Sequence, residues 1–411
     1  MDSSIPLNTV GGLDTGPLCP FVGRFIALVQ RLGYKPTSIR YQLRLIALLN
    51  RWLGRTRRRA EAVDEALIRR FLRQRFWRRR SHNGERSILR RFCSLLPAGE
   101  CSPRRERPKL SKRSAGIVGP FWQYLLKERG LAAHTAYAYA RWADKFLSSR
   151  FRGRPIRLRA LKGRDLTVFV QRSASRCSRA RMIHLVAALR SFCRFLRYRG
   201  QGDADLESAV PPVACWSLAD LPKRLSADEV EKVLAACDRQ MALGRRDFAI
   251  LLLLARLGLR AGEALALTLD DIDWDSGTIA IPMTKNRRGA RLPLPADVGA
   301  AIVEYLRRDR PRSDCRRVFL RTKAPYVGLS ASPVISNIAA RALRRAGVPS
   351  ARTGAHVFRH SFATTMLGRG ASLQEIGQLL RHSNPKTTAI YAKVDVEALR
   401  SIALPWPGGA R

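Results

Sequence analysis

The sequence predicts a mainly α-helical protein with a small β-sheet, the sheet belonging to an α+β domain in the C-terminal half. Two observations support this fold class. In the first 200 residues, apolar side chains recur with the helical period in stretch after stretch. The C-terminal half contains two short β-like runs, 278–281 and 291–294, between longer helical stretches. A chain of 411 residues with 46% apolar content is long enough for two or three globular domains.

The first expected domain, residues 1–105, is helical and rich in arginine. Its amphipathic stretches have basic outer faces and cover residues 21–33, 38–54, 63–80 and 86–96. Residues 102–114 follow, with proline and charge but no apolar periodicity. This composition predicts an exposed connection.

The second expected domain, residues 115–205, is a further helical set. Its helical stretches cover residues 120–130, 133–150, 161–172 and 180–200. The run LRRFCSLL at 89–96 lies one hundred residues before LRSFCRFL at 189–196, which indicates an internal duplication. Chance similarity between arginine-rich helices is the alternative. Residues 201–221 have mixed charge and proline, and we interpret them as an interdomain linker.

The third expected domain, residues 222–411, opens with a capping box. Ser226 and Glu229 have the spacing that satisfies the first amide groups of a helix. An apolar helix is expected over 248–259, and the run GLRAGE containing Arg260 follows it. The two β-like runs are then joined by the basic turn TKNRRG, which contains Lys285.

Residues 354–393 carry the densest group of polar side chains with a candidate chemical role. His356 and Arg359 are three apart in a helical pattern, so both are expected to project from about the same face. A second capping box, Ser372 with Glu375, predicts the next helix.

His382 lies at the end of that helix. Asn384 and Pro385 have the residue types of an N-cap and a first helical turn. The short helix that they begin carries Tyr391 about two turns later. Alone, each of these residues is more often a solvated or core side chain than a site residue.

The order and spacing of six positions resemble the tyrosine recombinases, the phage integrase and Xer family. The pattern comprises an arginine in a G-L-R run, a lysine in a hairpin, H-x-x-R, a His or Trp, and a tyrosine nine residues later. The matching residues here are Arg260, Lys285, His356, Arg359, His382 and Tyr391. The match covers about 225–394. It departs from the family at Arg381, where a glycine usually precedes the histidine.

The resemblance implies a site-specific recombinase or integrase of a mobile element, which cuts and rejoins DNA through a 3′-phosphotyrosyl bond. Tyr391 would be the nucleophile, and Arg260 and Arg359 would bind the phosphate. His356 is the candidate base and Lys285 the candidate acid.

His382 would donate a hydrogen bond to the phosphate. The family stores the energy of the broken bond in the phosphotyrosyl ester, so no cofactor, ATP or metal is expected. The sequence also contains no P-loop run and no dense carboxylate cluster. Two alternatives remain open: a type IB topoisomerase-like strand transferase, and a non-enzymatic DNA-binding regulator with the same fold.

The charge of the chain predicts a polyanionic partner. The formal net charge is +44, and 45 of the 76 Lys and Arg but only 11 of the 32 Asp and Glu lie in residues 1–200. Double-stranded DNA is the expected partner, with most of the contact surface in the N-terminal half. By resemblance, the second domain closes over DNA opposite the catalytic domain, and the protein acts as a homo-tetramer in the synapse, with or without companion recombinases.

The sequence indicates no export and no membrane. The longest apolar run, 248–255, is too short to span a bilayer, and the N-terminus lacks a basic n-region. The eight cysteines show no C-x-x-C pair and no zinc spacing, so reduced thiols are expected, several of them buried. We expect a cytoplasmic, nucleoid-associated protein.

Overall fold

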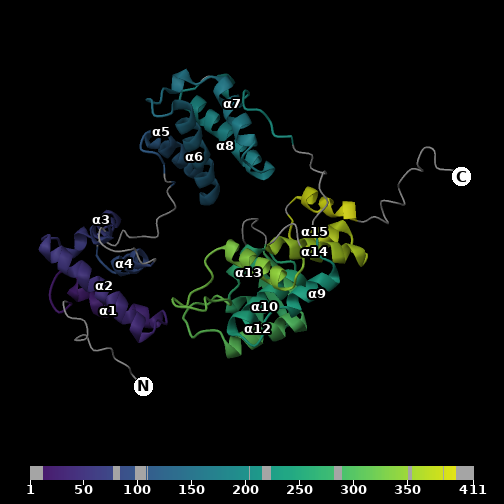
Figure 1. The fold of residues 1–411 in the computed structure, drawn as a ribbon. Coiled ribbons are helices and arrows are strands. Elements are labelled where there is room, and N and C mark those ends of the chain that lie inside the picture. Colours follow the sequence, from purple (N-terminus) through teal and green to yellow (C-terminus); the bar gives the residue numbers. More distant parts are fainter. Residues whose placement is uncertain are drawn as a thin grey trace. The chain divides into compact units, whose positions relative to one another are not determined.

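The structure is a computed structural model and is mostly helical (Figure 1). It describes residues 13–76, 84–97, 108, 110–202, 204–214, 224–281, 289–349, 354–382 and 384–394. The chain forms two compact units, one made of residues 101–217 and the other of residues 1–100 together with 218–411. The predicted fold class, mainly α with a small sheet, is confirmed.

The unit of residues 101–217 is a bundle of four helices, as predicted. They are α5 (Ala115–Lys127), α6 (Ala133–Phe151), α7 (Gly163–Ala174) and α8 (Arg179–Tyr198), with short 3-10 helices η3 (Leu158–Ala160) and η4 (Ala204–Leu206). Phe121, Phe146 and Phe192 are fully buried in its core. The helices therefore bury apolar stripes in a common core.

Parts of both expected linkers pack against this bundle instead of lying exposed. Ser114 is fully buried, and its hydroxyl is hydrogen-bonded to Asp144 of α6. Leu206 and Val210 are buried in the bundle core. The prediction of an exposed connection over 102–114 is therefore wrong at Ser114, because its burial depends on a contact with Asp144 that no local pattern signals.

The first four helices of the other unit match the four predicted at the N-terminal end. They are α1 (Cys19–Arg31), α2 (Pro36–Arg55), α3 (Glu65–Phe76) and α4 (Glu85–Cys93), with η2 (Ala60–Ala62) between α2 and α3. Phe25 and Phe92 meet edge to face, with ring centroids 5.3 Å apart. Leu89, Phe92, Cys93 and Leu96 are buried, as are Leu189, Phe192, Cys193 and Leu196 in the second set. This agreement supports the duplication, which stays a hypothesis.

The C-terminal part contains seven described α-helices and a three-stranded sheet. The helices are α9 (Ala227–Ala235), α10 (Ala242–Arg256), α11 (Ala261–Ala266), α12 (Ala296–Arg308), α13 (Ser332–Arg345), α14 (Ala355–Gly368) and α15 (Leu373–Leu379). The 3-10 helices are η5 (Leu269–Asp271), η6 (Pro385–Thr387) and η7 (Ala389–Val394). Helix α10 is central and packs against α12 and α14 (Figure 1).

The sheet is antiparallel with strand order β1-β2-β3. Its strands are β1 (Ile272–Asp273), β2 (Thr278–Ile281) and β3 (Ala290–Pro293), and Ile279 pairs with both Ile272 and Leu292. Strands β2 and β3 were predicted, whereas the two-residue strand β1 was too short for an alternating pattern.

Helix α10 begins six residues before the predicted apolar run. Its first turns contain Arg245 and Arg246, which an apolar pattern does not include. Arg245 pairs with Asp309, and buried Arg246 pairs with Asp247 at 2.7 Å. These ion pairs let charged residues lie in the first turns of a buried helix.

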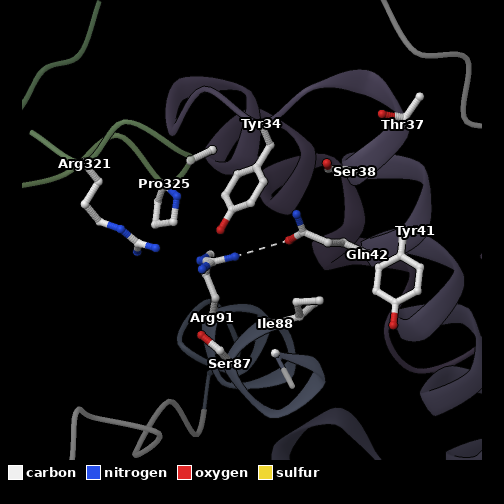
Figure 2. Close-up of a pocket in the computed structure, with 12 residues that line it drawn as sticks. Tyr34, Thr37, Ser38, Tyr41, Gln42, Ser87, Ile88, Arg91, Arg321 and Pro325 are labelled. Atoms are coloured by element: carbon white, nitrogen blue, oxygen red, sulfur yellow. Dashed lines mark hydrogen bonds between the residues drawn. The ribbon is translucent and has the colours of Figure 1, made fainter. Parts of the chain in front are cut away.

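Within this unit, the α1–α2 turn contacts the segment 313–326. The amide of Tyr326 donates to the carbonyl of Leu32 at 2.9 Å. A pocket of about 550 Å³ opens beside this contact, and Arg321 and Pro325 reach into it toward Tyr34 and Arg91 (Figure 2). Arg91 donates to Gln42 at 3.2 Å there. None of the predicted catalytic residues that the structure describes lines this pocket.

None of the described helices is long and apolar enough to cross a membrane. Six cysteines of the described residues are free thiols, and Cys93, Cys193 and Cys237 among them are buried. Burial raises the pKa of Cys193 to about 12 and that of Cys237 to about 11, so both stay protonated at neutral pH.

Candidate active site

Helix α14 supplies two of the predicted site residues and a third that was not predicted. His356 lies in its first turn and is exposed. Arg359, one turn later, is only 5% exposed. The Arg359 side chain is therefore turned into the domain, whereas that of His356 is open to solvent. The next residue, His360, is half-buried.

Arg359 connects the two chain segments that carry the other site residues. Its guanidinium donates to the carbonyl of Gly258, two residues before Arg260, and to that of Leu380, two residues before His382. Burial, and then the charge of Arg260, lower the pKa of Arg359 to about 9. An anion beside Arg359 would reverse this effect, because it would stabilise the charged form.

Arg260 lies at the start of α11 and is held by Glu263. Its Nη1 donates to Oε1 of Glu263 at 2.8 Å, and its own amide donates to Oε2 at the same distance. Its Nη2 donates to the carbonyl of Arg381 at 3.3 Å. The Arg260 side chain is still 25% exposed, so Arg260 is more accessible than Arg359.

His382 follows α15, whose predicted capping box is confirmed: the hydroxyl of Ser372 accepts from the amide of Glu375 at 3.2 Å. Nδ1 of His382 lies 2.7 Å from the hydroxyl of Thr388. Burial, and then the charges of Arg359 and Arg260, lower the pKa of His382 to about 4. His382 is therefore neutral at pH 7.

A neutral imidazole carries one N–H group. If Thr388 donates its hydroxyl proton to Nδ1 of His382, that N–H lies on Nε2 and can donate to a ligand.

Tyr391 lies in η7, two short 3-10 turns after Asn384. The predicted cap is confirmed, since Oδ1 of Asn384 accepts from the amide of Lys386 at 2.9 Å. The Tyr391 side chain is only 1% exposed, and its hydroxyl lies 3.0 Å from Nδ1 of His360. Burial raises the pKa of Tyr391, and the charges of Arg359 and Arg260 oppose that effect only in part.

Lys285 lies outside the described residues, between β2 and β3. The start of β3, where the described part of that hairpin resumes, lies near His382. Gly289 and Ala290 line a pocket of about 720 Å³ together with Arg381, His382 and Thr388.

The structure thus gathers Arg260, Arg359, His382 and Tyr391 in one region and places His356 on the same helix as Arg359. Three further residues, His360, Thr388 and Arg381, contact them and were not assigned a role from the sequence. His360 could have been noticed as a titratable neighbour of Arg359. Nothing in the sequence signals the Thr388 contact.

Two family descriptions match this chain. Residues 223–398 match the Phage integrase family, and residues 118–200 match the SAM-like domain described as the N-terminal domain of phage integrases. The second match covers the bundle α5–α8.

Relatives match over most of their own length. A Sinorhizobium fredii (strain NBRC 101917 / NGR234) protein, provisionally named an integrase/recombinase (y4rA), is 40% identical over 399 residues, 96% of each chain. The tyrosine recombinase XerC of Methylobacterium sp. (strain 4-46) is 34% identical and matches 69% of this chain and 90% of its own.

Solved structures share the fold. XerH recombinase bound to a palindromic difH substrate matches with a TM-score of 0.54 and 20% identity, over 95% of this chain and 97% of its own. The Tn1549 transposon integrase with circular intermediate DNA matches with a TM-score of 0.53 and 17% identity, over 69% of this chain and 99% of its own. From the 40% identity along nearly the whole chain, together with the two domain matches, we conclude that this protein belongs to the phage integrase family of tyrosine recombinases.

Proposed function

We propose that this protein is a site-specific recombinase of a mobile element that cuts and rejoins double-stranded DNA through Tyr391. One observation carries the proposal: the gathering of Arg260, Arg359, His382 and Tyr391, which come from separate segments of one domain. Two cations, a neutral hydrogen-bond donor and a nucleophile are the groups that a phosphodiester exchange requires.

Arg260 and Arg359 would bind the scissile phosphate. Attack on phosphorus builds negative charge on the non-bridging oxygens, and two fixed guanidinium groups stabilise that charge through charge-assisted hydrogen bonds. Arg260 is partly exposed, whereas Arg359 is buried and donates to the surrounding backbone carbonyls. His382, neutral, would donate from Nε2 to the same phosphate.

In the proposed reaction, the oxygen of Tyr391 attacks phosphorus, forms a 3′-phosphotyrosyl bond and displaces the 5′ oxygen of the next nucleotide. The tyrosine proton goes to a base, and the leaving oxygen takes a proton from an acid, so the reaction is balanced without water. His356 remains the proposed base and Lys285 the proposed acid. The 3.0 Å contact makes His360 a second candidate base.

Religation runs the same steps in reverse with a different 5′-hydroxyl. The ester bond energy is kept in the phosphotyrosyl intermediate, so the proposed chemistry needs neither ATP nor a metal ion.

Tyr391 must move before it can attack. A side chain that is 1% exposed cannot contact a DNA phosphate, so the covering residues or η7 itself must shift. A hydrogen bond to His360 and the small apolar cluster with Ala363, Ile376 and Leu380 hold the tyrosine side chain in place. We propose that DNA binding triggers this shift.

We propose double-stranded DNA as the partner, held between the bundle α5–α8 and the catalytic part, and a tetramer across two sites as the active assembly. A solved relative, the lambda integrase, is described as a dimer bound to a core site. The C-terminal segment 396–411 lies outside the described residues. A place in the cytoplasm at the nucleoid fits such a partner.

Replacing Tyr391 with phenylalanine tests the proposal. The probe is a nicked duplex containing a binding site selected with the wild-type protein from a random-sequence library, so that cleavage traps the protein covalently. Tyr391→Phe should abolish the covalent adduct and leave DNA affinity nearly unchanged, because only the attacking oxygen is lost.

Tyr305→Phe is the matched control, since the hydroxyl of buried Tyr305 serves the fold by accepting from the amide of Leu320 at 3.2 Å. It should still form the adduct. An adduct formed by Tyr391→Phe would show that another residue is the nucleophile. Relaxation of a supercoiled plasmid without strand exchange would favour the topoisomerase-like alternative.

A further inference from the structure

Arg381 adopts a backbone conformation that a residue with a side chain rarely takes. Its φ is +55°, in the left-handed region. It follows α15 in a Schellman motif: the amide of Arg381 donates to Gln378, and that of His382 donates to Gly377, both at 2.9 Å. Glycine is the usual residue at this position. The arginine is kept here although glycine would remove the strain.

The Arg381 side chain is turned inward and buried. It is 3% exposed, and its guanidinium donates to Oε2 of Glu263 at 2.7 Å and to the carbonyl of Leu379 at 2.9 Å. Its buried Nε has no hydrogen-bond partner among the described residues. A buried cation with one group unsatisfied is costly, and pairing with a charged neighbour offsets part of that cost.

That neighbour is Glu263, which Arg381 shares with Arg260. Oε1 of Glu263 accepts from the side chain of Arg260, whereas Oε2 accepts from the Arg260 amide and from Arg381. If Arg381 were absent, the full negative charge of Glu263 would face Arg260 alone. A carboxylate that neutralises Arg260 would compete with the DNA phosphate for it.

The local charge balance agrees with this interpretation. Arg260, Arg359 and Arg381 carry three positive charges against the one carboxylate of Glu263. Burial would raise the pKa of Glu263, but the Arg260 amide and the charge of Arg381 lower it overall, so Glu263 stays ionised. With Arg381 the site keeps a charge of +2, and without it +1.

We propose that Arg381 is a positioning residue for DNA cleavage: by neutralising Glu263 at Oε2, the oxygen that the Arg260 guanidinium does not use, it weakens the hold of Glu263 on that guanidinium and so favours its binding to the scissile phosphate. The inference rests on the proposed function and adds a third arginine to its phosphate site.

The test compares four variants with the wild-type protein in single-turnover covalent-adduct formation on the nicked duplex described above. Arg381→Gly removes the guanidinium and also the backbone strain, so the variant should fold. Glu263→Gln removes the carboxylate charge. The double variant Arg381→Gly/Glu263→Gln removes both. Arg381→Lys keeps the charge.

Arg381→Gly should slow adduct formation at saturating DNA by about 10- to 100-fold, the range seen when a residue that supports a charged ligand is lost. Its DNA affinity should change little. The double variant should recover most of that loss, because no carboxylate then competes for Arg260. Arg381→Lys should retain more activity than Arg381→Gly.

Wild-type rates in Arg381→Gly would overturn the proposal. So would a double variant slower than Arg381→Gly, because two merely structural contacts would add their losses. If thermal melting shows that a glycine variant is unfolded, Arg381→Gln with and without Glu263→Gln gives the same comparison. Failure of the wild-type protein to form any adduct would instead reject the proposed function itself.

Discussion

At the scale of single residues, His382 shows how the cationic surroundings determine what a side chain can do. Arg359, Arg260 and Arg381 surround an imidazole that is also partly buried, and together these effects keep it uncharged. A neutral histidine does not repel the arginines that we propose as the phosphate ligands, yet it can still donate one hydrogen bond. The same effect predicts a dependence of stability on pH.

The pKa of His382 is lowered from its ordinary value of 6.5 to about 4 in the folded protein. Between these values the unfolded chain binds the proton and the folded chain does not, so the free energy of unfolding should fall as the pH drops from 6.5 to 4. In His382→Gln, which cannot titrate, this dependence should be shallower. Urea titrations at several pH values measure it, and equal slopes for both proteins would contradict the low pKa.

His360 and His356 are the two candidate bases for the tyrosine proton, and mutation of each distinguishes them. His360→Phe removes the nitrogen that lies 3.0 Å from the Tyr391 hydroxyl. Adduct formation should slow by about 100-fold, as for loss of a general base, with unchanged DNA affinity. His356→Phe, the same substitution one turn earlier, is the matched control. If only His356→Phe slows the reaction, the base is the residue that sequence analysis assigned.

The sequence predicted the residues whose spacing is fixed along one or two helices, and it missed those brought in by tertiary contact. Arg359 and His382 lie at recognisable offsets from Tyr391. His360 contacts Tyr391 across 31 positions, and Arg381 contacts Glu263 across 118. No periodicity or cap rule links positions that far apart, so the side chains that tune the site became visible only in the folded chain.

At the scale of elements, the end of α10 must turn sharply to present Arg260. Gly258 makes this turn with φ of +56°, and its carbonyl accepts from Arg359. A Cβ atom added there would lie 2.7 Å from a ring carbon of Phe362 and 2.8 Å from a methyl carbon of Leu380. The helix end, α14 and α15 are therefore packed too closely for any side chain.

Gly258→Ala and Gly277→Ala form a matched pair. Gly277 has nearly the same φ, +58°, but nothing lies within 4 Å of an added Cβ. Gly277→Ala should lower the free energy of unfolding by about 1 kcal/mol, the cost of the left-handed conformation. Gly258→Ala should cost a further 1–3 kcal/mol or so through overpacking. Denaturant titration compares the two variants. Equal losses in the free energy of unfolding would mean that the neighbours of Gly258 shift to admit a methyl group without cost.

Helix existence was easier to predict than helix ends. The four helices of each N-terminal set and the capped helices α9 and α15 were predicted because their apolar faces or caps lie within the local sequence. The start of α10 depends on a partner 64 positions away, since Arg245 pairs with Asp309. The burial of Leu206 and Val210 likewise depends on a bundle formed by earlier helices.

At the scale of the whole molecule, the excess positive charge is arranged in part as a stripe on α2. Arg40, Arg44, Arg51 and Arg55 are exposed and share one face, because their spacings fit the helical period. The stripe is about 22 Å long at 1.5 Å per residue. It contains no predicted catalytic residue, which makes it suitable for testing the role of the first four helices.

Replacing these four arginines with glutamine should weaken DNA binding and make it less dependent on salt. Each phosphate contact contributes about −0.9 to the slope of log affinity against log salt, so loss of four contacts would flatten the slope by up to about 3.6. Fluorescence anisotropy at several salt concentrations gives the slope. An unchanged slope would mean that α2 faces protein in the assembly. Substitution is preferable to deleting residues 1–105, since deletion also removes the contact between Leu32 and Tyr326.

The compact unit of residues 1–100 and 218–411 cannot close until its C-terminal part has been synthesised. Leu32 leaves the ribosome long before Tyr326, and at 5–20 residues per second the delay is about 15 to 60 s. Residues 101–217 form their own compact unit and are complete within that interval. The unit that contains the first helices to be made is therefore the last to close, and the surface of the α1–α2 turn that Tyr326 will cover stays open to the solvent, or to nearby nucleic acid, throughout that time.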